Sequence, residues 1–232
     1  MIKRNIPNTI TCLNLVFGCL AVIAAMQGSA LMWANMTGYA WAYIFIGVAA
    51  VMDFCDGLAA RLLHAYSNLG KELDSLCDLV SFGVAPAMLV FQVMREGNGI
   101  PWLPYFAIFI AVMGALRLAR FNIDDSQTTS FVGLPIPANA IFWIGATAWV
   151  RQIGYPGDIV MLVLTVAVAL LMVCNIRMFS LKFKNFNWRE NFRRYVLIVG
   201  AVAFVLTQGL AGLAWTIILY LCISLLGRKD IA

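Results

Sequence analysis

Long apolar runs separated by short polar stretches dominate this chain. Six runs are long enough to cross about 30 Å of hydrocarbon as helices, and they cover residues 6–27, 40–60, 73–94, 102–120, 132–150 and 158–175. A further apolar region covers residues 195–226 and is interrupted at Thr207, Gln208 and Gly209. The pattern predicts six membrane-spanning helices followed by two short ones that turn near Gly209.

The composition agrees with this placement in lipid. Hydrophobic residues make up 62% of the chain and charged residues only 12%, whereas soluble domains have roughly 25% charged residues. Asn8, Thr11 and Asn14 interrupt the first apolar run, and no convincing cleavage site of small residues accompanies it. We therefore expect this run to be a retained span and not a signal peptide.

The positive charges predict an orientation for these helices. If the N-terminus is cytoplasmic, an alternating topology leaves Arg95 and Arg151 outside and every other lysine and arginine inside, as the positive-inside rule requires. Arg194 and Arg228 then lie on the same side, so the last apolar region crosses an even number of times and both termini are cytoplasmic. The net charge of +5 reflects this topology, and we expect no nucleic-acid partner.

One membrane domain is expected over residues 1–232, because the sequence has no internal repeat and no long linker. It divides into a six-helix core at 1–176, a basic segment on the cytoplasmic membrane surface at 177–194, and an extra helical hairpin at 195–227. The fold class is therefore an all-α integral membrane protein with eight helices in total, located in the cytoplasmic membrane.

Four aspartates lie inside two of the predicted spans, namely Asp53, Asp56, Asp74 and Asp78. One aspartate at the centre of a spanning helix costs roughly 2.5–3.5 kcal/mol, so we expect compensating partners. Helical spacing places Asp53 and Asp56 on one face, and Asp74 and Asp78 on one face of the next helix. Because the link at 62–69 is short, the two helices are expected to be antiparallel neighbours whose acidic faces meet near the cytoplasmic surface.

Carboxylates this close resist ionising together unless cations compensate their charge. The four positions include no cysteine or histidine, and hard oxygen ligands favour Mg²⁺, Mn²⁺ or Ca²⁺ over Zn²⁺. Two such cations in an acidic cage are typical of phosphoryl transfer. The alternative is an ion pathway in a transporter, but these acids lie at one end of adjacent helices, whereas transporter sites usually lie near the midplane.

Small residues accompany the acidic faces. Gly57, Ala60 and Gly70 allow either a bulky ligand or a neighbouring helix to come close to the carboxylates. Arg61 lies on the same face as Gly57, and it either binds a phosphate group or extends to the membrane surface.

Residues 53–78 read DFCDGLAARLLHAYSNLGKELDSLCD. This segment resembles, without departure, the signature of the CDP-alcohol phosphotransferase family, which is DxxDGxxAR, eight further residues, and GxxxDxxxD. The resemblance implies a six-helix core around a polar cavity open to the cytoplasm, a homodimer, and two divalent cations, Mg²⁺ or Mn²⁺, with Ca²⁺ as a further possible occupant.

The same resemblance implies roles for individual residues. Asp53, Asp56 and Asp74 would be metal ligands, and Asp78 would be both a ligand of the second metal and the general base. The residues that it implies around the CDP group are Asn8, Thr11, Asp53, Gly57, Ala60, Arg61 and Gly70.

The segments DSLCDLVSFGVAPAML at 74–89, ALRLARFN at 115–122 and GLPIPANA at 133–140 resemble the phosphatidylserine synthase branch of the family. This resemblance implies transfer of the phosphatidyl group from CDP-diacylglycerol to L-serine by direct displacement, giving phosphatidylserine and CMP. The alternatives are another acceptor, glycerol 3-phosphate or inositol phosphate, or an archaeal lipid donor.

Two arginines end the fourth predicted span on its cytoplasmic side. Arg117 and Arg120, with Asn122 nearby, are candidates for binding the anionic group of the acceptor or a phosphate. The alternative is simple anchoring at the membrane surface. Pro137 lies at the start of the fifth span, and Asn139 is expected to offer one more donor to the cavity.

Overall fold

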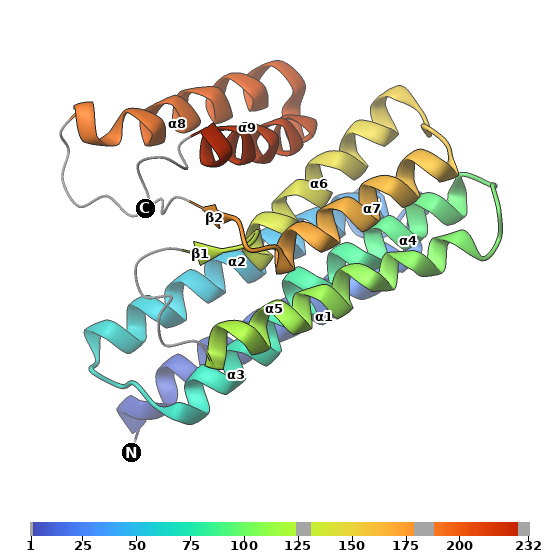
Figure 1. Cartoon of the computed structure of the whole chain (residues 1–232). Coiled ribbons are helices and arrows are strands. Elements are labelled where there is room, and N and C mark those ends of the chain that lie inside the picture. The colour runs from blue at the N-terminus through green and yellow to red at the C-terminus, as the bar shows by residue number, and fades with distance from the viewer. Residues whose placement is uncertain (1, 124–130, 179–187, 227–232) are drawn as a thin grey trace.

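The structure is a computed structural model that describes residues 2–123, 131–178 and 188–226. Figure 1 shows helices α1 to α7 running along a common direction as one bundle, with α8 and α9 lying against one side of it. The helices are α1 (Ile2–Gln27), α2 (Gly38–Leu62), α3 (Asn68–Asp78), α4 (Ala85–Glu96), α5 (Ile108–Ile123), α6 (Ile136–Ile153), α7 (Asp158–Val173), α8 (Trp188–Gln208) and α9 (Gly212–Leu226).

Short elements join these helices. The 3₁₀ turns are η1 (Trp33–Asn35), η3 (Leu103–Ala107) and η4 (Gly209–Ala211), and η2 (Leu79–Val84) is a π-helical turn between α3 and α4. Strands β1 (Phe131–Val132) and β2 (Arg177–Met178) form a two-residue antiparallel pair.

Within the described ranges, five helical segments are long and apolar enough to cross a membrane. They are Asn5–Gln27, Gly38–Leu62, Asn68–Glu96, Leu103–Ile123 and Asn191–Leu226, and α7 is a shorter apolar helix. These segments agree with the predicted all-helical membrane protein. The predicted span at 132–150 corresponds to α6, which is not among the five.

The last apolar segment folds back on itself. The chain passes from α8 to α9 through η4, where Gly209 has a left-handed backbone with φ of 60°, a conformation that glycine adopts readily. Helices α8 and α9 pack on each other, and α9 also packs on α6. The interruption around Gly209 therefore predicted the position of this turn. Half of the predicted basic segment at 177–194, residues 179–187, lies outside the described residues, and its last residues form the start of α8.

Helix α3 continues through the π-helical turn into α4, and a proline accounts for the irregularity. Pro86 has no N–H group, so the carbonyl of Phe82, four residues earlier, lacks its α-helical donor. The side chain of Asn139, from α6, donates to this carbonyl over 3.1 Å. Asn139 is fully buried, and its side chain binds α6 to the turn. The sequence predicts that Asn139 offers its donor to the cavity, and this prediction is wrong.

The opposite end of the bundle is held by polar contacts between helices. The backbone N–H and the hydroxyl of Ser29 donate to the carboxylate of Glu96 over 2.9 and 2.7 Å. The guanidinium of Arg151 lies 4.5 Å from the ring centroid of Tyr39 and donates to Thr37. These contacts tie the α1–α2 connection to α4 and α6.

We predict that Asn139→Leu destabilises the protein by about 1–3 kcal/mol, because it leaves the buried Phe82 carbonyl without a donor. Thermal unfolding in detergent would measure this as a lower Tm. Gln152→Ala, on the exposed end of the same helix, is the control and should leave Tm nearly unchanged. Equal Tm values for Asn139→Leu and the unaltered chain would contradict this role.

Candidate active site

Three of the four predicted aspartates meet in one cluster. Asp53 and Asp56 come from α2 and Asp74 comes from α3, and one carboxylate oxygen from each lies within 4.8 Å of the others. Asp56 is buried, and Asp53 and Asp74 are partly buried. The cluster therefore brings together carboxylates from the two acidic faces that the helical spacing predicts, one on each helix.

Helix α1 packs against both helices that carry the cluster. Helices α2 and α3 are antiparallel, as their short link requires, but each packs mainly on α1 and makes few contacts with the other. The carboxylates of α2 and α3 therefore approach one another across α1, which contributes Asn8, Thr11 and Asn14 to this region.

Asp78 lies one helical turn beyond Asp74, at the C-terminal end of α3. It is 9% exposed, and it lies within electrostatic range of Asp53 and Asp74. Its Oδ1 atom accepts a hydrogen bond of 3.2 Å from the side-chain amide of Asn14. Asp78 is thus a deeper neighbour of the three-aspartate cluster.

The cluster fits a divalent cation. The Oδ2 atom of Asp56 and the Oδ1 atom of Asp74 are buried, and neither has a hydrogen-bond partner among the described residues. Buried carboxylate oxygens are costly unless a partner compensates them. Oxygen ligands without histidine or cysteine suit Mg²⁺ or Mn²⁺.

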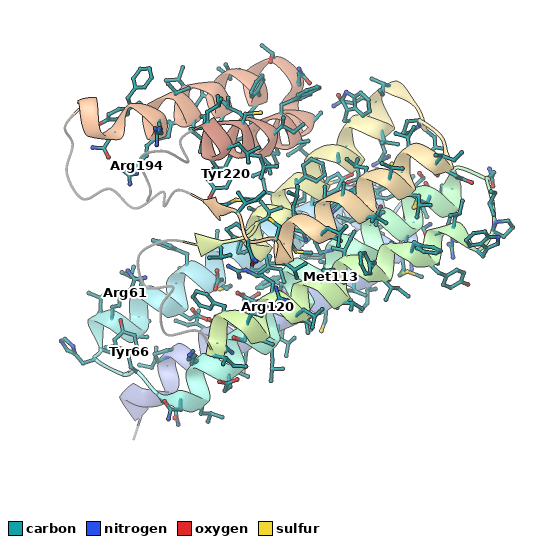
Figure 2. The ribbon with its side chains drawn as sticks, viewed as in Figure 1. Arg61, Tyr66, Met113, Arg120, Arg194 and Tyr220 are labelled. Atoms are coloured by element: carbon teal, nitrogen blue, oxygen red, sulfur yellow. The ribbon has the colours of Figure 1, made fainter. Side chains whose placement is uncertain are left out.

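A cavity of about 490 Å³ opens beside the cluster. It lies at the end of the bundle where Figure 2 labels Arg61 and Tyr66. Its walls come from α1, α2, the α2–α3 link and α3, and they comprise Pro7, Asn8, Thr11, Asp56, Gly57, Ala60, Ala65, Tyr66, Ser67, Asn68, Gly70, Lys71 and Asp74.

The small residues of this cavity differ in what surrounds them. A Cβ atom at Gly57 would meet nothing closer than Nη2 of Arg61, at 4.0 Å. A Cβ atom at Gly70 would lie 3.1 Å from both Asn8 and Ser67. Close packing therefore accounts for Gly70, whereas the space at Gly57 leaves room for a ligand. Arg61 is exposed at the edge of this space.

Arg117 is the predicted acceptor residue that interacts electrostatically with Asp78. It is buried on α5, 9% exposed, and its guanidinium lies 5.4 Å from the ring centroid of Phe121. It is within electrostatic range of Asp78 and of Tyr220 from α9, which Figure 2 labels where α9 faces the bundle. The hairpin thus reaches the same region as the aspartates.

The other two predicted acceptor residues join helices. Arg120 donates to the carbonyl of Val173, at the end of α7, over 3.0 Å. The side-chain amide of Asn122 donates to Ser75 over 3.0 Å, and its backbone carbonyl accepts from Lys71. These contacts connect α5 to α7 and to α3.

Asn14, Tyr66 and Lys71 belong to this region, but the sequence had not assigned them to the site. Asn14 was visible only as a polar residue within an apolar run. Tyr66 lies between the two halves of the signature and Lys71 lies in its second half, and both occupy positions that the signature leaves unspecified. Their position in the cavity wall depends on how the link folds over α1, and no local pattern encodes that.

The chain is similar in sequence to a known protein family and to several of its members. A family model described as CDP-alcohol phosphatidyltransferase matches residues 4–224. The CDP-diacylglycerol–serine O-phosphatidyltransferase of Bacillus subtilis is 41% identical over 136 residues, which are 57% of this chain and 69% of the relative. The protein of that name from Helicobacter pylori is 30% identical over 220 residues, 93% and 87% of the two chains. The one from Methanocaldococcus jannaschii is 32% identical over 172 residues, 74% and 72%.

We predict that Asp56→Asn weakens Mn²⁺ binding by at least about tenfold, because it removes one anionic oxygen from the cluster. Titration of the purified protein with Mn²⁺, followed by electron paramagnetic resonance, would measure the change. Asp158→Asn is the matched control, because Asp158 lies at the far end of the bundle, where it accepts from Ile100 and Tyr155. Unchanged Mn²⁺ affinity in Asp56→Asn would exclude the cluster as the metal site.

Proposed function

This chain belongs to the CDP-alcohol phosphatidyltransferase family, and from this premise we propose that it transfers the phosphatidyl group of CDP-diacylglycerol to L-serine. The products would be phosphatidylserine and CMP. The observation that carries this proposal is the cluster of Asp53, Asp56 and Asp74 beside a cavity of about 490 Å³. The acceptor follows the names of relatives that are 30–41% identical.

The cavity would hold the CDP group with its pyrophosphate next to the carboxylates. Asn8 and Thr11 from α1 and Gly57 and Ala60 from α2 line it, together with Gly70 from α3. The open space at Gly57 supports a ligand of this size. Arg61 at the rim and Asp53 in the cluster complete the group of CDP-binding residues that we propose.

Two divalent cations, Mg²⁺ or Mn²⁺, would be bound by Asp53, Asp56, Asp74 and Asp78. When bound, they would supply positive charge that stabilises the pyrophosphate as its phosphorus is attacked. Two buried carboxylate oxygens that lack partners among the described residues support this assignment.

Asp78 would act as the general base. Its carboxylate takes the proton of the serine hydroxyl while the hydroxyl oxygen forms a bond to the phosphorus that bears the diacylglycerol. The bond from that phosphorus to the bridging oxygen breaks, and the electron pair leaves with CMP. The buried position of Asp78 next to the cluster supports this role.

We propose direct displacement because the serines near the cluster are engaged elsewhere. The hydroxyl of Ser81 donates to the backbone carbonyl of Asn14 over 3.1 Å and is fully buried. The hydroxyl of Ser75 donates to the carbonyl of Lys71 and accepts from Asn122. Neither hydroxyl has the adjacent base that a covalent intermediate would need.

Serine suits the acceptor side of the aspartates better than a phosphorylated alcohol does. Arg117 is the predicted acceptor residue within electrostatic range of Asp78, whereas Arg120 and Asn122 bind neighbouring helices. One buried guanidinium matches the single carboxylate of serine. The doubly charged phosphate of glycerol 3-phosphate or inositol phosphate would require more positive groups.

We place the protein in the cytoplasmic membrane with the cavity facing the cytoplasm. Arg61 and Lys71 lie at the cavity end, and Arg95 and Arg151 lie at the other, which follows the positive-inside rule. The proposed topology has eight crossings, cytoplasmic termini, a catalytic core at 1–176 and a hairpin at 195–227. We also propose a homodimer.

An acceptor panel tests the proposed function. Purified protein with CDP-diacylglycerol and Mn²⁺ should release CMP with L-serine, and release should stop when EDTA removes the metal. Glycerol 3-phosphate and inositol phosphate are the competing acceptors. CMP release that requires one of these instead would overturn serine as the acceptor, and the absence of release with all of them would contradict the family's chemistry here.

We predict that Arg117→Met raises the KM for serine by about tenfold or more, because a lost hydrogen bond to a charged group costs about 1.5–3 kcal/mol. The KM for CDP-diacylglycerol should change little. Arg120→Met is the matched control on the same helix, and its serine KM should change less than about threefold. Equal effects of the two variants on the serine KM would contradict a specific role for Arg117.

A further inference from the structure

Asn14 is a polar side chain in an apolar helix that packing alone does not explain. It is fully buried on α1. Its Nδ2 group donates to Oδ1 of Asp78 over 3.2 Å, across 64 positions in the sequence. Its own Oδ1 atom is buried without a hydrogen-bond partner among the described residues. An apolar side chain of this size would avoid the cost of that unpaired carbonyl. The hydrogen bond that Asn14 donates to Asp78 is therefore the interaction that an apolar residue at this position could not make.

The backbone around Asn14 is held against the turn that follows Asp78. The hydroxyl of Ser81, in the π-helical turn η2, donates to the carbonyl of Asn14 over 3.1 Å. One turn further along α1, a Cβ atom at Gly18 would lie 2.2 Å from the Ser81 hydroxyl. Helix α1 can therefore approach η2 this closely only because residue 18 has no side chain.

These contacts define where the Asp78 carboxylate points. Asp78 is the last residue of α3, and the irregular turn η2 begins directly after it. A carboxylate that binds a donor through Oδ1 is restricted about its side-chain torsions. The amide of Asn14 occupies Oδ1, and Oδ2 remains for other partners.

We propose that Asn14 is the positioning residue of Asp78, holding its carboxylate in the orientation needed for metal binding and for removal of the acceptor proton. This inference rests on the proposed function, in which Asp78 is the general base. The unpaired Oδ1 of Asn14 is itself enclosed by protein, so Asn14 acts through Asp78 and does not contact the substrate.

Asn14→Leu is the decisive variant, because it keeps the size of the side chain and removes the donor. We expect kcat for serine-dependent CMP release to fall about 10- to 100-fold, the effect of one hydrogen bond to a charged group. The KM for CDP-diacylglycerol should change less than about twofold, because the CDP cavity is lined by other residues. Mn²⁺ titration followed by electron paramagnetic resonance should show weaker binding at one of two sites.

Two further variants separate positioning from packing. Gln92→Leu removes another buried amide, one that donates to the carboxylate of Glu96 at the opposite end of the bundle and not to Asp78, so kcat and Mn²⁺ affinity should stay within about twofold. Ser81→Ala frees the Asn14 carbonyl with a smaller change in volume, and it should lower kcat in the same direction as Asn14→Leu. Ser81→Ala also tests the proposal if Asn14→Leu does not fold.

A double variant tests whether Asn14 acts through Asp78. With Asp78→Glu, whose longer side chain shifts the carboxylate, adding Asn14→Leu should lower the residual kcat by less than about twofold. A full additional loss would overturn the proposal, and so would unchanged kcat and Mn²⁺ binding in Asn14→Leu alone. If the unaltered chain releases no CMP with serine, the proposed function fails, whereas Mn²⁺ binding still tests the role of Asn14.

Discussion

Charge compensation of four aspartates inside an apolar bundle is the constraint on which the rest of this structure depends. On insertion scales, four uncompensated aspartates would cost on the order of 10 kcal/mol, which is comparable to the whole stability of a typical domain. Asp53, Asp56 and Asp74 meet within 4.8 Å, and Asp78 lies next to them with an amide donor. A divalent cation in the cluster would compensate this charge, and its binding would then be coupled to the folding of the bundle.

The surrounding helices hold this cluster in place and leave space beside it. Helix α1 lies against both α2 and α3, which keeps their backbones apart and makes room for the cavity. The π-helical turn after Asp78 is bound on one side by α1 through Ser81 and on the other by α6 through Asn139. At the opposite end, the contacts of Glu96 and Arg151 connect α1, α2, α4 and α6. The carboxylates therefore project from a framework that is fixed at both ends.

Local patterns in the sequence were sufficient to predict the helices and the acidic cluster. Apolar runs predicted α1, α2, α5, α6 and α7, and one further span at 73–94 that the structure divides into α3, the turn η2 and α4. The interruption at Gly209 predicted the turn between α8 and α9, and helical spacing predicted the two acidic faces. The contact of Asn14 with Asp78 joins residues 64 positions apart, and no periodicity encodes it.

The different environments of Arg117 and Arg120 were also not predictable from the sequence. Both residues end the same predicted span, and only the packing of α5 against its neighbours brings Arg117 within electrostatic range of Asp78 and Arg120 into a hydrogen bond at the end of α7. Pro86 was a local signal for the irregular turn, but the donor that satisfies Phe82 comes from a distant helix. Tertiary packing therefore determines these contacts, although the residues themselves are visible in the sequence.

The most direct test of metal binding by the aspartates is an anomalous difference map from crystals grown with Mn²⁺. We predict a peak among the carboxylates of Asp53, Asp56 and Asp74, and a second peak next to Asp78. A map in which Mn²⁺ appears elsewhere on the protein while the aspartate cluster shows no peak would contradict it.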